Sequence, residues 1–260
     1  MSRPKHLFKA WSTIRRFARQ ANRLALFADF DGTLAPICSR PGEARMPAKV
    51  RRLLPQVEQS GTTVAIVSGR KIQDVCRRVG LRSVWYVGAH GFSLRSPGGR
   101  TVLLTTPAER HRIRRLEVAL RRKLKGVRGI EIEPKTATVA VHYRRARCGQ
   151  RDAAWTVLQG LVRKISGVKL LEGKKVWEIL PDRQIDKWTA VKSILRRKRR
   201  TQGSLLLFYL GDDTTDEAVF RKMKGISVAV GKRHKTAARF YLRSPAEVGR
   251  FLEKWVELAE

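Results

Sequence analysis

The sequence predicts an α/β protein, with an open, mostly parallel β-sheet flanked by helices and a smaller α+β domain inserted into the chain. Three apolar runs of strand length, at residues 24–28, 62–67 and 205–210, each end in small or charged residues. Between the second and third runs, residues 106–180 show helical patterns and partly alternating strand patterns, as a one-sided sheet would. We therefore expect a core made from residues 1–105 and 181–260, with residues 106–180 inserted.

The first apolar run ends in two carboxylates, Asp29 and Asp31, and the turn signal Gly32-Thr33 follows. In an open parallel sheet, ligands bind at the carboxyl ends of the strands. Two neighbouring acids at a buried edge carry a desolvation cost that a core has no reason to bear. They indicate a chemical site, and the alternative is a helix N-cap that contains aspartates.

The second run ends in Ser68, Gly69 and Arg70. The Ser68 hydroxyl can hydrogen-bond a phosphate oxygen at the tip of this strand. Alternatively, Ser68 caps a helix that starts near Lys71. Both interpretations can hold together, because a helix N-terminus also favours an anion.

The third run is followed by four acids within six residues: Asp212, Asp213, Asp216 and Glu217. Such a cluster repels itself unless a cation lies within it. Hard oxygen ligands with no nearby His or Cys suit Mg²⁺. We therefore expect a magnesium site at this strand end.

A fourth segment contributes Lys187, which opens an expected helix and supplies a fixed positive charge. In chain order, the four segments resemble the motifs of the haloacid dehalogenase superfamily of phosphohydrolases. Four further stretches resemble trehalose-6-phosphate phosphatases: residues 86–91, 133–144, 173–181 and 211–217. The similarity runs from about Leu24 to the C-terminus.

The resemblance implies a Rossmann-like catalytic core, a cap domain that sets substrate specificity, and Mg²⁺-dependent hydrolysis of trehalose 6-phosphate. Asp29 would attack phosphorus, since an aspartate with a pKa of about 3.9 is ionised at neutral pH. Asp31 would act as general acid and base, and Ser68 and Lys187 would stabilise the phosphoryl oxygens. Phosphatases of sucrose phosphate and glycosyl phosphoglycerate are the alternatives within this class.

The resemblance also implies two sets of ligands. The Mg²⁺ ligands would be Asp29, the backbone carbonyl of Asp31, Asp212, Asp213 and Asp216. The substrate contacts would be Thr33, Gly69, Arg70, His90, Lys135, His142, Arg144, Lys174 and Glu178. Trp188 stands where the family usually has glycine, and an indole there could narrow the phosphate pocket or reorient Lys187.

Several of these residues have structural alternatives. His142 and Arg144 share an expected strand face, so they could reach one ligand or line the solvent face of the cap sheet. Glu178 stands beside Trp177, so an inward-pointing acid is a stronger interpretation for it than for His142. His90 either borders the substrate entrance or stabilises its own loop.

The net charge of +34 and a pI near 11.4 are not explained by the enzyme interpretation. Such a field attracts phosphorylated substrates, and also nucleic acid and anionic membranes. A polyanion-binding protein with a weak or inactive phosphatase site is therefore the alternative of another class. However, the basic residues between 110 and 124 surround apolar positions at helical spacing, which favours a solvated helix face. The run 196–200 resembles a nucleic-acid or localisation patch, but its place between an expected helix and an expected strand favours a basic helix C-terminus.

Residues 5–23 place Leu7, Trp11, Ile14 and Ala18 on one helical stripe among Arg and Lys. We expect an N-terminal helix packed on the core or lying on a membrane surface, with a transit peptide as the alternative. Three cysteines without paired or metal-ligand spacing indicate a reducing compartment. No apolar run approaches the length of a membrane span, so we expect a cytoplasmic protein. We also expect a monomer.

Overall fold

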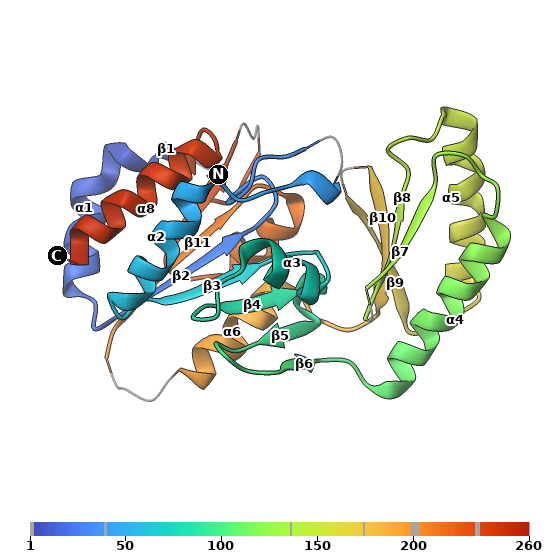
Figure 1. Ribbon diagram of the computed structural model, residues 1–260, viewed down its shortest axis with the longest axis horizontal. Coiled ribbons are helices and arrows are strands. Elements are labelled where there is room, and N and C mark those ends of the chain that lie inside the picture. Colours follow the sequence, from blue (N-terminus) through green and yellow to red (C-terminus); the bar gives the residue numbers. More distant parts are fainter. Residues whose placement is uncertain are drawn as a thin grey trace. The chain divides into compact units, whose positions relative to one another are not determined.

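The structure is a computed structural model that describes residues 3–38, 41–135, 137–173, 175–198, 203–231 and 235–259. The chain divides into two compact units (Figure 1). Unit 1 comprises Met1–Val102 and Ile185–Glu260, and unit 2 comprises Leu103–Gln184. The expected division of labour between a catalytic core and a specificity cap stays a prediction.

Within the described residues, unit 1 is built on a nine-stranded sheet of order β1-β13-β12-β11-β2-β3-β4-β5-β6. The strands are β1 (Lys5–His6), β2 (Arg23–Asp29), β3 (Thr63–Val67), β4 (Trp85–Gly88), β5 (Ser93–Arg95), β6 (Thr101–Leu103), β11 (Leu205–Gly211), β12 (Ile226–Val230) and β13 (Phe240–Leu242). Neighbours from β1 through β4 pair in parallel, and β5 runs antiparallel to β4. This confirms the α/β class with a mostly parallel sheet.

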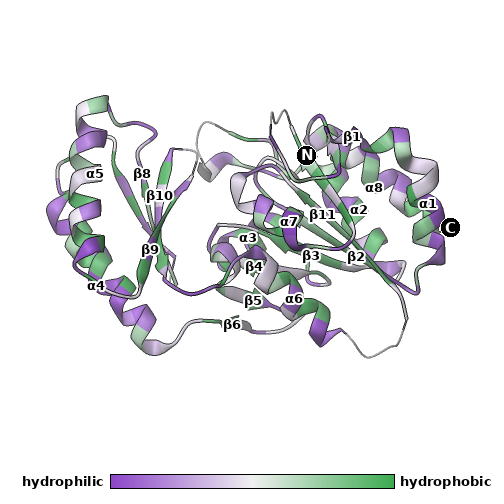
Figure 2. Cartoon of the chain, turned by 180° about the vertical axis from the view of Figure 1, so that it is seen from behind, coloured by the Kyte–Doolittle hydropathy of each residue, from purple (hydrophilic) through white to green (hydrophobic). Residues whose placement is uncertain are grey.

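Helices cover both faces of this sheet (Figures 1 and 2). Side chains alternate along β2, so Leu26, Ala28 and Phe30 share one face. They belong to a core cluster that includes residues of four helices: α1 (Trp11–Gln20), α2 (Ala48–Gln59), α3 (Ile72–Val79) and α8 (Pro245–Ala259). On the other face, Tyr209 contacts Phe220 of α7 (Glu217–Lys222), which packs beside α6 (Lys187–Arg197).

Short 3₁₀ helices complete unit 1. They are η1 (Leu7–Ala10), η2 (Pro41–Glu43), η3 (Ala89–Gly91) and η4 (Thr214–Asp216). Of these, η3 directly follows strand β4, and η4 begins three residues after the end of β11.

The N-terminal segment packs on the core, and it is not helical throughout. Leu7 and Ile14 are fully buried, and Trp11 meets Phe251 of α8 edge to face. The helix begins only at Trp11, because β1 pairs with β13 at the sheet edge and η1 follows. His6 Nε2 lies 2.9 Å from the Glu247 carboxylate, which joins this strand to α8.

Unit 2 is a four-stranded antiparallel sheet of order β7-β8-β10-β9 packed against two helices. Its elements are α4 (Pro107–Lys123), β7 (Glu131–Pro134), β8 (Val139–His142), α5 (Cys148–Arg163), β9 (Val168–Gly173) and β10 (Val176–Pro181). Thr106 and Glu109 form a capping box that starts α4. Leu116 and Leu120 are buried, whereas Arg114 and Arg115 are exposed, so the two sides of α4 differ as its pattern predicts.

Among the described helices, none combines the length and the apolar character that crossing a bilayer requires.

Candidate active site

The buried centre of unit 1 is an ion-paired cluster at the carboxyl ends of β2 and β11. These strands are parallel neighbours, so Asp29 at the end of β2 and the residues after Gly211 reach one place. Lys187 opens α6, as expected, and its Nζ donates to Asp29 Oδ1 at 2.6 Å and to Asp216 Oδ1 at 2.7 Å. Asp29 is therefore the last residue of a strand and not a helix cap.

Charge in this cluster is unbalanced. Carboxylate oxygens of Asp29, Asp212 and Asp216 lie within 4.8 Å of one another, and Asp29 and Asp216 share the Lys187 ammonium. Burial raises the pKa of Asp29; Lys187 opposes the rise, and Asp216 and Asp212 add to it. Asp216 and Asp29 raise the pKa of Lys187 despite its burial, so this lysine stays cationic.

Asp216 is held from several sides. Its Oδ1 accepts from the Tyr209 hydroxyl at 2.8 Å as well as from Lys187, and its Oδ2 accepts from the backbone N–H of Asp213 at 2.9 Å. Burial, together with the charge of Asp216, raises the pKa of Tyr209 well above its usual value. Tyr209 therefore remains a neutral donor that fixes Asp216.

The turn after Asp31 brings the third carboxylate close. Gly32 has φ +82°, and a Cβ there would collide with the Asp212 carboxylate. Glycine is needed both for this backbone and for the approach of Asp212. The neighbouring Thr33 is fully buried, and its hydroxyl finds no hydrogen-bond partner among the described residues.

The donor set suits a hard divalent cation. When they are ionised, the three buried carboxylates outnumber Lys187, in a site with little water to screen their charge. Carboxylate oxygens are the ligands that Mg²⁺ prefers. The cluster can therefore hold a metal ion.

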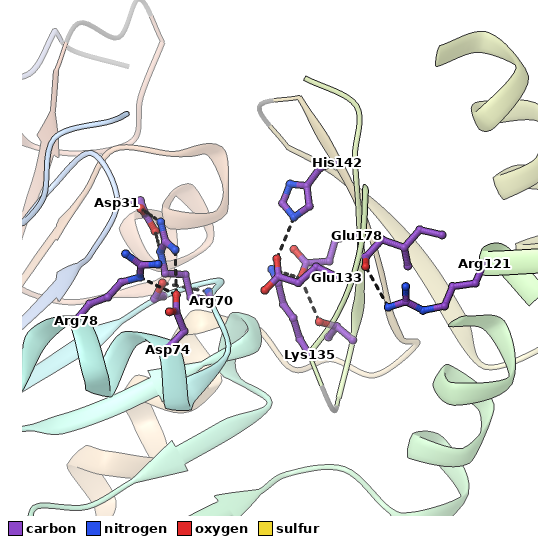
Figure 3. A network of polar contacts seen from close by, with 12 residues as sticks. Asp31, Arg70, Asp74, Arg78, Arg121, Glu133, Lys135, His142 and Glu178 are labelled. Carbon is purple, nitrogen blue, oxygen red and sulfur yellow. Dashed lines mark hydrogen bonds and ion pairs between the residues drawn. The ribbon is translucent and has the colours of Figure 1, made fainter. Parts of the chain in front are cut away.

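Asp31, two residues beyond Asp29, lies against Arg70 (Figure 3). Its side chain is 39% exposed, whereas that of Asp29 is 7% exposed. Arg70 donates to both Asp31 oxygens, from Nε at 2.7 Å and from Nη2 at 2.6 Å. The two acids of the motif thus have different partners and different access to water.

Ser68 is buried beside this pair. Its hydroxyl accepts from the backbone N–H of Arg70 at 3.1 Å, and α3 starts at Ile72 without a side-chain cap. The expectation that Ser68 caps this helix is therefore wrong, because the hydroxyl serves the turn that precedes it. A hydroxyl that accepts one hydrogen bond can still donate to a phosphate oxygen.

His90 lies in a turn with positive φ values at three successive residues, Ala89, His90 and Gly91. A Cβ at Gly69 would lie 2.6 Å from His90 Cε1, so the imidazole covers Gly69. A Cβ at Gly91 would meet the backbone carbonyl of Asp186, immediately before Lys187. The turn therefore contacts both the Ser68 loop and the start of α6.

The other two acids that follow β11, Asp213 and Glu217, bind backbone N–H groups outside the Lys187 cluster. Asp213 Oδ1 accepts from the Thr214 N–H at 2.8 Å, and Asp213 does not belong to the metal-sized cluster. Glu217 Oε2 accepts from the Ala237 N–H at 2.8 Å. A metal-ligand role for Asp213 stays a prediction.

Unit 2 carries a second buried polar cluster (Figure 3). Lys135 Nζ donates to Glu178 Oε1 at 2.8 Å, and Thr138 donates to the same oxygen at 3.1 Å. His142 Nε2 lies 2.9 Å from Glu133 Oε2 on the same sheet. The structure therefore brings Lys135, Glu178 and His142 into one region of the sheet.

Arg144 and Lys174 are the other two substrate contacts expected in the cap. Arg144 is exposed and follows the end of β8. Lys174 lies outside the described residues. Their substrate roles stay predictions.

With this geometry in place, comparison with known proteins assigns the family. The family model described as trehalose-phosphatase matches residues 27–246. The chain belongs to the trehalose-phosphatase family.

Members of the family from distant organisms are similar to this chain. A trehalose-phosphate phosphatase of Mycobacterium ulcerans is 35% identical over 88% of this chain, which spans only 60% of that relative's length. Probable trehalose-phosphate phosphatase 3 of Oryza sativa subsp. japonica is 32% identical over 96% of this chain and 74% of its own length. The C-terminal domain of C. albicans trehalose-6-phosphate phosphatase has the same fold, with a TM-score of 0.82 at 22% identity over 98% of this chain and 99% of that domain.

Trp188, the departure from the family pattern, leaves the motif lysine in place. Lys187 still reaches Asp29 and Asp216, while the indole ring lies 6.0 Å from Lys192 Nζ, one turn along α6. Lys187 therefore keeps both carboxylate partners beside the indole, and an effect of Trp188 on the phosphate pocket stays a prediction.

Sequence reasoning missed four polar residues that the trehalose-phosphatase structure places at these clusters: Asp74, Thr138, Tyr209 and Glu133. Asp74 carries a local signal, because it lies four residues from Arg70 and from Arg78. Glu133 lies diagonally from His142 across paired strands, which becomes visible only once the register is known.

Proposed function

We propose that the protein hydrolyses trehalose 6-phosphate to trehalose and phosphate through an aspartyl-phosphate. The observation that carries this proposal is the buried cluster of Asp29, Asp212 and Asp216 around Lys187, in a chain of the trehalose-phosphatase family. Asp29 supplies the nucleophile, and Lys187 fixes its carboxylate and provides positive charge.

The reaction takes two steps. An Asp29 oxygen forms a bond to phosphorus, the bond from phosphorus to the sugar oxygen breaks, and Asp31 gives that oxygen a proton. Water then attacks phosphorus, Asp31 takes a proton from it, and the bond to the Asp29 oxygen breaks to release phosphate. The greater exposure of Asp31 supports this role, because an acid-base group must exchange protons with water.

Mg²⁺ bound in this cluster would neutralise charge on the phosphate and so allow an anionic nucleophile to approach. We propose Asp29 and Asp212, with the Asp31 carbonyl, as its main ligands. Asp216 is a weaker candidate, because both of its oxygens already accept hydrogen bonds. Ser68 would donate to a phosphoryl oxygen.

The sugar would be recognised by polar residues of unit 2. Lys135, Glu178, His142 and Glu133 offer both donors and acceptors, which hydroxyl groups require. The family resemblance adds Arg144 and Lys174 to this set, and Thr33, Gly69 and His90 from unit 1.

A substrate panel tests the proposal. Purified protein with Mg²⁺ is assayed for phosphate release from trehalose 6-phosphate, sucrose 6-phosphate, a glycosyl phosphoglycerate and p-nitrophenyl phosphate, with Asp29→Asn as the negative control. We expect the largest kcat/KM with trehalose 6-phosphate. Faster turnover of another sugar phosphate would reassign the substrate, and no release from any of them would reject the enzyme.

The high positive charge supports a second proposal, namely weak polyanion binding. Exposed Arg114, Arg115 and Arg122 on α4 contribute to this charge. Binding through phosphate contacts falls steeply with salt, so we expect dissociation constants on the order of micromolar or weaker near physiological salt. Tight DNA or RNA binding that persists there, without sugar-phosphate turnover, would favour the binding protein over the enzyme. A cytoplasmic location stays a prediction.

A further inference from the structure

Arg70 is engaged by two carboxylates at once. Its Nε and Nη2 donate to the two oxygens of Asp31, and its Nη1 donates to Asp74 Oδ2 at 3.0 Å (Figure 3). A bidentate arginine–carboxylate pair fixes the plane of the carboxylate as well as its distance. The Asp31 side chain, although 39% exposed, therefore has one defined orientation.

Asp74, which binds the Arg70 guanidinium on the side away from Asp31, is itself held in place by Arg78. Asp74 Oδ2 also accepts from Arg78 Nε at 2.8 Å. Arg78 Nη1 in turn donates to the carbonyls of Gly42 and Ala44, at 3.0 and 2.8 Å. The network thus runs from Asp31 through α3 to the segment around residue 42, and its two arginines balance its two aspartates.

Arg70 is also fixed by its backbone and by an aromatic ring. Its N–H donates to Ser68 Oγ, and its carbonyl accepts from Ala89 N–H at 2.8 Å. Its guanidinium carbon lies 5.6 Å from the centre of the Phe30 ring. Rotating this side chain toward another ligand would break charge-assisted bonds to both Asp31 and Asp74.

We infer that Arg70 is a positioning residue, which, supported by Asp74, orients Asp31 for proton transfer and does not itself bind the substrate phosphate. The inference rests on the proposed function. If it holds, removing Arg70 slows the step that needs Asp31 and leaves substrate affinity almost unchanged. An acid-base group displaced by about 1 Å costs roughly 100-fold in rate.

A kinetic double-mutant cycle tests this relation. Arg70→Ala, Asp31→Asn and the double variant are assayed with the best substrate of the panel. We expect Arg70→Ala to lower kcat roughly 30- to 100-fold, with KM changed less than about threefold, and to have no further effect in the Asp31→Asn background. Equal losses in both backgrounds, or a loss that falls on KM, would show direct substrate binding and overturn the inference.

Conservative and control variants sharpen the result. Arg70→Lys keeps the positive charge but loses the two parallel hydrogen bonds to Asp31, so its kcat should be little higher than that of Arg70→Ala. Asp74→Asn should slow turnover less than Arg70→Ala. Glu117→Gln breaks a similar ion pair four residues from Arg121, in unit 2, and should leave kcat unchanged.

Unfolding of the same four proteins separates this inference from the proposed function. If wild-type protein hydrolyses nothing, the proposed function fails, but the pair can still be judged by urea unfolding. A coupling of about tenfold in the unfolding constant supports the orientation of Asp31 by Arg70. Additive unfolding effects overturn it, whether or not the protein is active.

Discussion

Each unit buries a lysine against carboxylates, and the two sites differ in charge balance. In unit 1, Lys187 shares a cluster with Asp29, Asp212 and Asp216. In unit 2, Lys135 forms an ion pair with Glu178. The carboxylates of the first cluster outnumber its lysine, whereas Lys135 and Glu178 pair one to one.

This difference agrees with the proposed division between reaction in unit 1 and recognition in unit 2. Excess negative charge in a buried site is costly unless a cation enters, and the same charge supplies a nucleophile once the cation is present. The ion pair of Lys135 and Glu178 needs no added cation, and its two side chains can still bind the neutral hydroxyl groups of a sugar. The comparison therefore supports chemistry in unit 1 and sugar recognition in unit 2.

Among the variants that test this contrast, Asp29→Asn should have the largest effect. Removing the nucleophile should lower kcat on the order of 10⁴-fold or more, as removal of a catalytic nucleophile does in other enzymes. Phosphate release is measured, with Glu117→Gln as the control, because Glu117 is an acid of unit 2 that does not belong to the cluster. Wild-type kcat in Asp29→Asn, with slow deamidation excluded by mass spectrometry, would contradict the covalent mechanism.

Metal removal comes next. Dialysis against EDTA should abolish turnover, and Mg²⁺ should restore it. At about 100 times its dissociation constant, Mg²⁺ should also raise the free energy of unfolding by about 2.7 kcal/mol. Calorimetry of wild type and Asp212→Asn checks this, since Asp212→Asn should lose most of the stabilisation. An equal gain in both proteins would place the metal elsewhere.

Breaking the ion pair of Lys135 and Glu178 should lower the stability of the protein and raise KM. Glu178→Ala leaves Lys135 buried without this partner and should destabilise the protein by about 3–5 kcal/mol. Glu117→Ala removes a partly exposed pair and should cost about 1 kcal/mol or less. Urea unfolding measures both.

The activity of the pair is best read in Glu178→Gln, which keeps the shape of the side chain. We expect KM for trehalose 6-phosphate to rise about tenfold or more, as loss of a charged hydrogen-bonding partner implies. Turnover of p-nitrophenyl phosphate, which lacks the sugar, should change little. A matching loss with both substrates would argue against sugar recognition.

The smallest expected effect concerns Asp74. Burial alone would raise the pKa of its carboxyl, but hydrogen bonds from Arg78 and Arg70 outweigh burial and lower the pKa. Such a group stabilises the fold above its unfolded pKa of about 3.9, and the contribution disappears as pH falls through the lower folded pKa.

Asp74→Asn should therefore reduce the free energy of unfolding by about 1–2 kcal/mol near neutral pH. The difference from wild type should shrink in acid, which urea unfolding across a pH series measures. A difference that does not vary with pH would mean that Asp74 acts through packing and not through its charge.

The parts that the sequence predicts are those encoded locally. The apolar runs of β2, β3 and β11 end where expected, and Lys187 begins a helix. The short strand β1 has no such signal, because two residues carry no period and the sheet edge offered by β13 decides their conformation.

Within the site, the sequence shows which residue types gather but not where they point. Four acids follow β11, but their side chains have different partners. Asp216 accepts a hydrogen bond from Lys187 in the cluster, Asp213 caps η4, and Glu217 accepts from the backbone N–H of Ala237. The pairing of Arg70 with Asp31 joins residues 39 apart in the chain, so no local pattern reveals it.

The strand order of unit 1 also bears on how the chain folds. Central strand β2 lies between β3 and β11, and β1 pairs with β13, so the sheet combines segments from before and after unit 2. Unit 2 is continuous from Leu103 to Gln184, and its sheet pairs strands close in sequence. Contacts between distant residues form slowly because long loops must close first. On a ribosome, unit 2 can complete its sheet before β11 exists, whereas unit 1 must wait for residue 242 to emerge.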